Sequence, residues 1–185
     1  MNKPLRSAKP GDIFLLLLPT GDDLERLIQD QQSWQTRFGG QPVSPIHITA
    51  ERFSPKNGQL PQGCVTTICE NISTLPAFQA EADALIQFFA PYWQSYVLRW
   101  RVKESPIWNS FREQVKSTLE QIDCPSHFWR QRHATCTILK LDNKINLPSP
   151  PPEISMPLFY VREVHISTLK KGGNFEILEK FSLQE

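Results

Sequence analysis

A strand–helix–strand pattern occurs twice in this sequence, and no other feature constrains the fold as strongly. The first copy spans residues 12–54 and the second spans residues 95–141. In each copy an apolar strand leads to a helix with one apolar stripe, and the helix leads to a strand that carries His-x-Thr. The repeat is two-fold and does not have the period of a solenoid. It predicts an α+β molecule in which the two units pack side by side and each contributes one His-x-Thr strand to a shared crevice.

Elements outside the repeat are predicted from apolar spacing and from turn residues. The segment 64–72 is rich in β-branched residues and predicts a strand. Apolar residues between Pro76 and Pro91 recur at helical spacing and predict a further helix. Two strands at about 158–168 and 175–183, joined by a Lys-Lys-Gly-Gly-Asn turn, predict a closing hairpin.

The charge balance narrows the class of protein. The chain has 185 residues with 20 Lys+Arg and 19 Asp+Glu, a net charge of +1. A protein that coats long stretches of nucleic acid needs a strong basic excess, so this class is disfavoured. The same balance permits a cleft that holds a single phosphate. The length and the 39% hydrophobic fraction are those of one ordinary soluble domain.

The N-terminal segment has some features of a signal peptide. An apolar run at 13–18 follows Lys3, Arg6 and Lys9. The run is shorter than a secretory core and no small-x-small cleavage site follows it, so a buried strand is predicted instead. The four cysteines form no Cys-x-x-Cys pair and fit no zinc-finger spacing, which favours reduced, buried thiols. Together these features predict a cytoplasmic protein without a membrane span.

Two His-x-Thr motifs, His47 with Thr49 and His133 with Thr135, are the chemically informative part of the sequence. Residues i and i+2 of a strand face the same side, so each motif presents an imidazole beside a hydroxyl. Imidazole transfers protons near neutral pH, and a hydroxyl can hydrogen-bond a phosphate oxygen. Two facing motifs would supply a general acid, a general base and two phosphate-binding groups, and this chemistry needs no metal or cofactor.

Other residues near the motifs are weaker candidates. Phe53 has the strand parity of the first motif and is predicted either to contact a substrate base or to be a core aromatic. Arg130 and Arg132 flank the second motif with the opposite parity, so we expect them in solvent or against backbone groups unless the strand starts late. His165 begins a third His-x-hydroxyl tripeptide, but no helix separates it from the second motif, and it is predicted to be a sheet residue. Whether His165 or the two arginines touch a substrate is left open by the sequence.

In these motifs and their order the chain resembles the two-histidine (2H) phosphoesterase superfamily, and most closely its 2′-5′ RNA ligase-like or RNA 2′,3′-cyclic phosphodiesterase branch. The resemblance includes the apolar strand and Pro-Thr turn at 14–20, the two motifs 86 residues apart, and the closing stretch 164–183. It implies a bilobal, pseudo-two-fold α+β fold, with two antiparallel sheets flanking a central cleft and helices on the outside. Residues 1–185 would then form a single bilobal domain, closed by the hairpin at 158–183.

The resemblance also implies an activity. The family's reaction is metal-independent hydrolysis of a 2′,3′-cyclic phosphate, or of a 2′-5′ phosphodiester, at an RNA end or in a nucleotide, and it leaves a 2′-phosphate. Carried over, His47 and His133 are the catalytic pair, and Thr49 and Thr135 bind the phosphate. His47 would protonate the leaving 3′ oxygen and His133 would activate water, although the pseudo-symmetry of the two units leaves the reverse open. We expect a monomer acting in RNA processing on an RNA end or a small cyclic nucleotide, without cofactor or membrane.

The sequence departs from the family pattern at a few positions. Ala50 and Cys136 stand where the family often has leucine, and 137–139 lacks an arginine often found there, so that Lys140 is the nearest cation. These differences leave the physiological substrate open. Two readings from other classes also remain: a protein that binds nucleotides or RNA ends with little turnover, and an ordinary α+β interaction protein.

Overall fold

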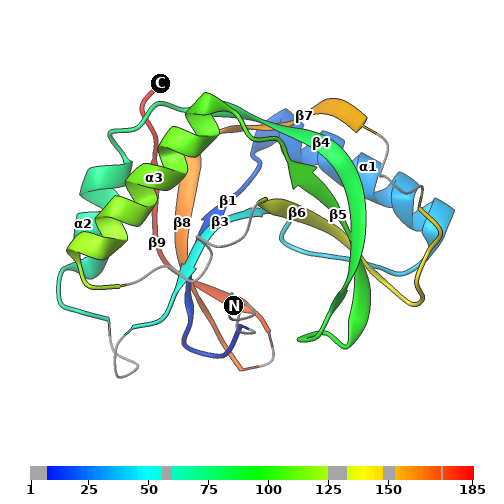
Figure 1. The fold of residues 1–185 in the computed structure, drawn as a ribbon, viewed down its shortest axis with the longest axis horizontal. Coiled ribbons are helices and arrows are strands. Elements are labelled where there is room, and N and C mark those ends of the chain that lie inside the picture. The colour runs from blue at the N-terminus through cyan, green and yellow to red at the C-terminus, as the bar shows by residue number, and fades with distance from the viewer. Residues whose placement is uncertain (1–7, 56–59, 125–132, 148–152, 172) are drawn as a thin grey trace, which may run out of the picture.

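Nine strands and three helices make up the part of the chain that this computed structural model describes, residues 8–55, 60–124, 133–147, 153–171 and 173–185 (Figure 1). The strands are β1 (Ile13–Leu17), β2 (Gln41–Pro42), β3 (Ile48–Phe53), β4 (Phe78–Ala90), β5 (Ser95–Val102), β6 (Thr135–Leu141), β7 (Glu153–Val161), β8 (Glu163–Leu169) and β9 (Phe175–Ser182). The helices are α1 (Gly21–Phe38), α2 (Cys64–Ile72) and α3 (Pro106–Gln121). The predicted α+β class is confirmed.

The strands form one strongly curled antiparallel sheet with a symmetric order. The order is β7-β4-β5-β6-β3-β1-β8-β9, and β2 pairs with β6 outside this path. The two strands that follow the predicted motifs, β3 and β6, are therefore in the middle, with β1 and β5 outside them. The middle pair is short, because Ile48 opposite Cys136 is its one registered pair. The two expected sheets are thus the halves of a single sheet, joined at this narrow point.

The helices of the two repeat units lie on the outside of the curled sheet (Figure 1). Helix α1 contacts β6 and β7, whereas α3 contacts β3 and α2, so each helix packs against the half of the sheet that the other unit supplies. Gln31 of α1 strengthens the contact between α1 and β6, since its Nε2 donates to the Ile138 carbonyl at 2.7 Å. The same Nε2 donates to the Val43 carbonyl at 2.9 Å. Helix α3 begins as predicted, with Ser105 accepting a hydrogen bond from the Trp108 amide at 3.2 Å. These contacts between the helices and the strands hold the two halves of the sheet together.

The prediction of a strand at 64–72 is wrong, because these residues form helix α2. Cys64, Ile68 and Ile72 recur at every fourth position, and all three are buried in the core. The helical spacing of these three side chains overrides the strand preference of the β-branched residues between them.

The prediction of a helix between Pro76 and Pro91 is also wrong, because this segment forms the long strand β4. Its buried alanines, Ala80, Ala82 and Ala84, alternate with less buried residues. Alanine is the strongest helix former, so its presence at these positions obscured a strand period of two. The expected strand at 158–168 is likewise two strands, β7 and β8, which separate at Arg162.

The core fills the space between the sheet and the helices. Its largest fully buried side chains include Trp100, Trp108 and Phe159. All four cysteines are free, and three of them are buried. In the described part of the chain, no helix has the length and apolar character needed to span a membrane.

Candidate active site

Polar side chains gather where the two halves of the sheet join, on the face that points away from the core. Ile48 and Cys136 are paired and buried in the core. In an antiparallel ladder their neighbours lie on the opposite face, which places Thr49 across from Thr135 and the position of His47 across from Thr137. The register therefore places Thr49 beside Thr135, with the position of His47 next to them on the same face.

His47 lies immediately before β3, and its orientation is fixed by a backbone group. Its Nδ1 donates a hydrogen bond to the Pro45 carbonyl at 2.8 Å. Because a carbonyl can only accept, the proton is on Nδ1, and in the neutral ring Nε2 keeps a free lone pair. Burial lowers the pKa of His47 and the positive charge of Arg99 lowers it further, although the hydrogen bond to Pro45 acts in the opposite direction. The ring is thus kept neutral and ready to accept a proton at Nε2.

His133 lies two residues before Thr135 and has a different environment. The ladder continues beyond β6, because the Val102 amide donates to the Ala134 carbonyl at 2.9 Å. Ala134 is buried and His133 is 40% exposed, so the imidazole is on the same face as the Thr135 hydroxyl. Its Nδ1 is 3.4 Å from Oε1 of Glu104, a carboxylate that can orient the ring.

Arg99 on β5 is a candidate site residue that the sequence did not reveal. Its Nη1 donates to Oγ1 of Thr135 at 3.1 Å, and its guanidinium carbon is 4.1 Å from the centre of the Phe88 ring. Burial lowers the pKa of Arg99 to about 10, so the group is still charged at neutral pH. Its Nε is buried without a hydrogen-bond partner, and no carboxylate in the described ranges forms an ion pair with it. A partly buried cation without a counter-ion is a candidate binding group for an anion.

Arg101 on the same strand differs from Arg99, because it has a carboxylate partner. It has the same strand parity as Arg99, but its Nε is 2.6 Å from Oδ1 of Asp83, which neutralises it. The signal in the sequence was two arginines at alternate positions of an otherwise apolar strand. The sequence alone did not reveal which of the two has a carboxylate partner.

Phe53 is not on the face predicted for it. The register of β1 with β3 shifts between Leu15 and Leu16, which oppose Glu51 and Thr49 respectively. The extra residue is a β-bulge, and a bulge reverses the parity of every residue beyond it. Phe53 is consequently 0% exposed in the core, and the prediction that it could contact a substrate is wrong for this reason.

The remaining candidates are placed as follows. His165 pairs with Leu16 in the sheet, is largely buried, and its Nε2 is hydrogen-bonded to Oε1 of Glu163. It is a sheet residue as predicted, yet it lines a pocket together with His47. Arg130 and Arg132 lie outside the described residues. Within the described ranges, no three His, Cys, Asp or Glu side chains are grouped so that they could hold a metal ion.

Comparison with known proteins finds matches to the fold of this chain but not to its sequence. No protein-family model and no curated protein matches the sequence. Solved structures do match the fold. E. coli LigT, in a complex with NADP+, is 16% identical with a TM-score of 0.62, and the match covers 96% of this chain and 100% of LigT. TT0787 of Thermus thermophilus is 17% identical with a TM-score of 0.66, covering 94% of this chain and 98% of that one.

Two further solved structures also have a similar fold. A protein described as a phosphoesterase is 17% identical with a TM-score of 0.64, covering 96% of this chain and 100% of that one. The PDE domain of MHV ns2 is 14% identical with a TM-score of 0.56, over 92% of this chain and 100% of the domain. The chain has the fold of the 2H phosphoesterases. At these identities the similarity defines the fold, whereas the function depends on the chemistry of the site.

Proposed function

We propose that the protein is a metal-independent phosphodiesterase that hydrolyses a 2′,3′-cyclic phosphate, or a 2′-5′ phosphodiester, of an RNA end or nucleotide and leaves a 2′-phosphate. The observation that carries this proposal is the combination of two histidines with a partly buried cation, Arg99, that has no carboxylate partner among the described residues. His47 and Arg99 flank the joint between the halves of the sheet, and Thr135 is hydrogen-bonded to Arg99. The hydrogen bond of Arg99 to Thr135 and its effect on His47 support an anion site beside the first histidine, and His133 lies two residues before Thr135.

The phosphate is held by Thr49, Thr135 and Arg99. The two hydroxyls face each other across β3 and β6 and can each donate to a phosphate oxygen. Arg99 contributes a positive charge and directed N–H groups, which stabilise the charge that develops on the phosphate oxygens during attack. It also supplies the cation that the sequence lacks directly after the second motif.

Proton transfer is divided between the two histidines. Water attacks the phosphorus and loses a proton to Nε2 of His47, while the bond from phosphorus to the 3′ oxygen breaks and His133 gives that oxygen a proton. The lowered pKa of His47 suits the base, and the Glu104 carboxylate provides a counter-ion beside the ring that acts as the acid. This order is the reverse of the one implied by the family resemblance, and the difference arises from the surroundings of each ring. Exchange of protons with solvent then resets both histidines.

The structural neighbours support a nucleotide substrate. E. coli LigT has been crystallised with NADP+, with 3′-AMP and with ATP, and the other neighbours include a phosphoesterase and a PDE domain. We propose the same substrate class for this chain, with an RNA end or a small cyclic nucleotide as the partner.

We further propose that the chain acts as one bilobal unit, as a monomer, in the cytoplasm. The symmetric strand order about β3 and β6 supports a single domain made of two repeats. The free cysteines support a reducing compartment.

The test is hydrolysis of a nucleoside 2′,3′-cyclic phosphate by the purified protein in the presence of EDTA. Phosphorus NMR of the product identifies which oxygen keeps the phosphate. We expect turnover that resists the chelator and yields the 2′-phosphate. Binding without hydrolysis would assign the chain to the nucleotide-binding class instead, and loss of turnover in EDTA would refute the metal-independent mechanism.

A further inference from the structure

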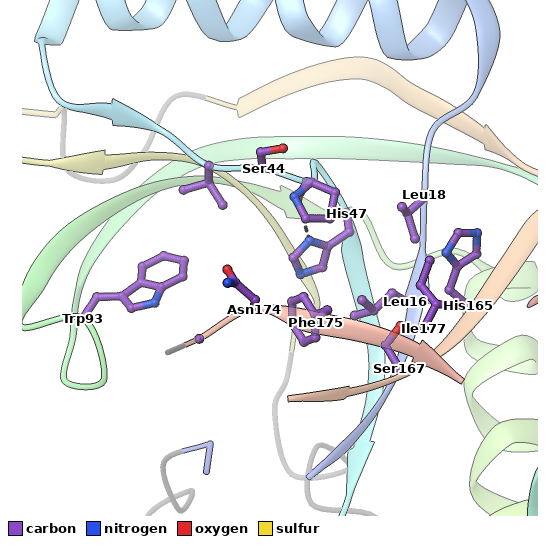
Figure 2. A pocket seen from close by; sticks show the side chains of 13 residues that line it. Leu16, Leu18, Ser44, His47, Trp93, His165, Ser167, Asn174, Phe175 and Ile177 are labelled. Carbon is purple, nitrogen blue, oxygen red and sulfur yellow. Dashed lines mark hydrogen bonds between the residues drawn. The ribbon is translucent and has the colours of Figure 1, made fainter. Parts of the chain in front are cut away.

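A pocket of about 340 Å³ lies next to His47, on the side of β1, β8 and β9 (Figure 2). Neither Thr49 nor Thr135 lines it, so it is a separate compartment that shares His47 with the proposed phosphate site. Its volume is at the lower end of the range for small-molecule sites, about 300–1,000 Å³. It has room for one compact group attached to a phosphate held beside His47.

Two aromatic side chains from opposite halves of the sheet form walls of this pocket. Trp93 comes from the turn between β4 and β5, and Phe175 begins β9 (Figure 2). The Phe175 ring makes an edge contact with the His47 ring, with centroids 5.4 Å apart. Trp93 lies across the pocket from His47 in this view. Aromatic faces of this kind bind planar heterocycles by stacking.

The two turns that carry these walls also approach each other. A Cβ placed on Gly173, in the turn between β8 and β9, would be 3.5 Å from Oη of Tyr92 in the turn between β4 and β5. Gly173 has φ of +88°, a conformation that favours glycine. The halves of the sheet therefore meet at this end of the pocket, and a ligand here would contact both.

The pocket is also lined by polar groups that can form hydrogen bonds with a ligand. Asn174 presents an amide, which can both donate and accept, and His165 lies at the wall near Leu18 (Figure 2). Ser167 is 1% exposed, and its Oγ has no hydrogen-bond partner within the described residues. A pocket with aromatic walls and such polar groups suits a planar ligand ring whose edge carries both hydrogen-bond donors and hydrogen-bond acceptors.

We propose that this pocket binds the nucleobase of the substrate, stacked on Trp93, while Thr49, Thr135 and Arg99 hold the phosphate beside His47. The inference rests on the proposed function, because that function places the phosphate beside His47. It assigns the base of that nucleotide or RNA end to a defined pocket beside His47. A sugar phosphate without a base would fill only the phosphate site.

The test is equilibrium binding by calorimetry of two ligands, adenosine 2′-monophosphate and 1-O-methylribose 2-phosphate, which lacks the base. We expect Trp93→Ala to weaken binding of the nucleotide by about 5- to 150-fold, the size of base–aromatic stacking, and to leave binding of the sugar phosphate unchanged. Trp93→Phe should keep most of the affinity because it retains an aromatic face. Phe89→Ala is the matched control, since Phe89 is an exposed aromatic at the end of β4 that does not line the pocket.

The outcomes separate this inference from the proposed function. Equal affinity of the wild-type protein for the two ligands, or an equal effect of Trp93→Ala on both, would overturn the nucleobase pocket. Absence of binding by either ligand would overturn it as well. Binding that depends on the base and on Trp93, in a protein that does not hydrolyse the cyclic phosphate, would support the pocket while refuting the phosphodiesterase.

Discussion

Arg99 donates a hydrogen bond of 3.1 Å from Nη1 to Oγ1 of Thr135, across the pairing of β5 with β6. The bond connects a charged group on one strand to a motif residue on the next. The hydroxyl accepts from the guanidinium, so its own proton is free to point toward a phosphate oxygen. The same guanidinium lowers the pKa of His47, after the larger effect of burial. One side chain thus influences both substrate binding and proton transfer.

Replacing Arg99 should weaken binding of the phosphate group. A charge-assisted hydrogen bond contributes about 1.5–3 kcal/mol, which corresponds to an increase in KM of about 10- to 150-fold for Arg99→Gln. Arg99→Lys should recover part of this loss, because it keeps the charge but not the planar arrangement of N–H groups. The measurement is steady-state kinetics on a nucleoside 2′,3′-cyclic phosphate.

Arg101→Gln is the matched control for this variant. Arg101 is on the same strand with the same parity, but Asp83 already neutralises it. Its replacement should change KM less than about threefold, which is the scale of a partly exposed ion pair. Equal effects at the two positions would show that Arg99 has no special part in phosphate binding.

The pH dependence of kcat/KM should reflect the environment of His47. The base must be neutral to accept a proton, so activity is lost as pH falls through the pKa of His47 in the free enzyme. Because this pKa is lowered from 6.5, mainly by burial, the acidic limb should lie below pH 6.5. Arg99→Gln removes a nearby positive charge and should move the limb to higher pH. A wild-type limb above pH 6.5, or a shift in the opposite direction, would contradict the assignment of His47 as the base.

The acid can be identified with substrates of different leaving groups. A good leaving group, such as nitrophenolate, departs without protonation, whereas a ribose oxygen needs the acid. We therefore expect His133→Ala to lose much less activity on a nitrophenyl phosphodiester than on a dinucleoside 2′-5′ phosphodiester, and His47→Ala to lose similar activity on both. The opposite result would restore the order of roles that the family resemblance implies.

Phe53 provides a test of the fold rather than of the chemistry. Phe53→Ala should destabilise the protein by about 3–5 kcal/mol, because it leaves a cavity in the core. Phe53→Leu fills most of that cavity and should leave KM unchanged. Thermal unfolding and kinetics on the same samples measure both effects. A selective rise in KM for nucleotide substrates in Phe53→Leu would indicate that the ring contacts the substrate after all.

Several features of the fold followed directly from the sequence because local and long-range signals agreed. Helix α3, which begins at Pro106, is capped by the Ser105 side chain and has a proline in its first turn, and both act as expected. Strand alternation correctly placed Thr49 and Thr135 on the face opposite the core. The motif residues are close to the joint of the sheet, where the parity argument spans only a few residues.

The features that were missed depend on contacts between distant parts of the chain. The bulge in β3 is defined by its pairing with β1, and it moved Phe53 from the site to the core. The role of Arg99 depends on its neighbour on β6 and on the absence, among the described residues, of a carboxylate such as the Asp83 that pairs with Arg101. His165 lines a pocket with His47 because β8 pairs with β1. None of these relationships is encoded in a local pattern of residues.

The most direct test of the two-histidine mechanism is a measurement of kcat/KM for a nucleoside 2′,3′-cyclic phosphate in wild type, His47→Ala, His133→Ala and the double variant. Each single replacement should reduce kcat/KM by about 10²- to 10⁴-fold, while circular dichroism and the melting temperature confirm that the fold is retained. The double variant should lose less than the product of the two single losses, because the two rings act in one step. Activity within about twofold of wild type in either folded single variant would contradict the mechanism.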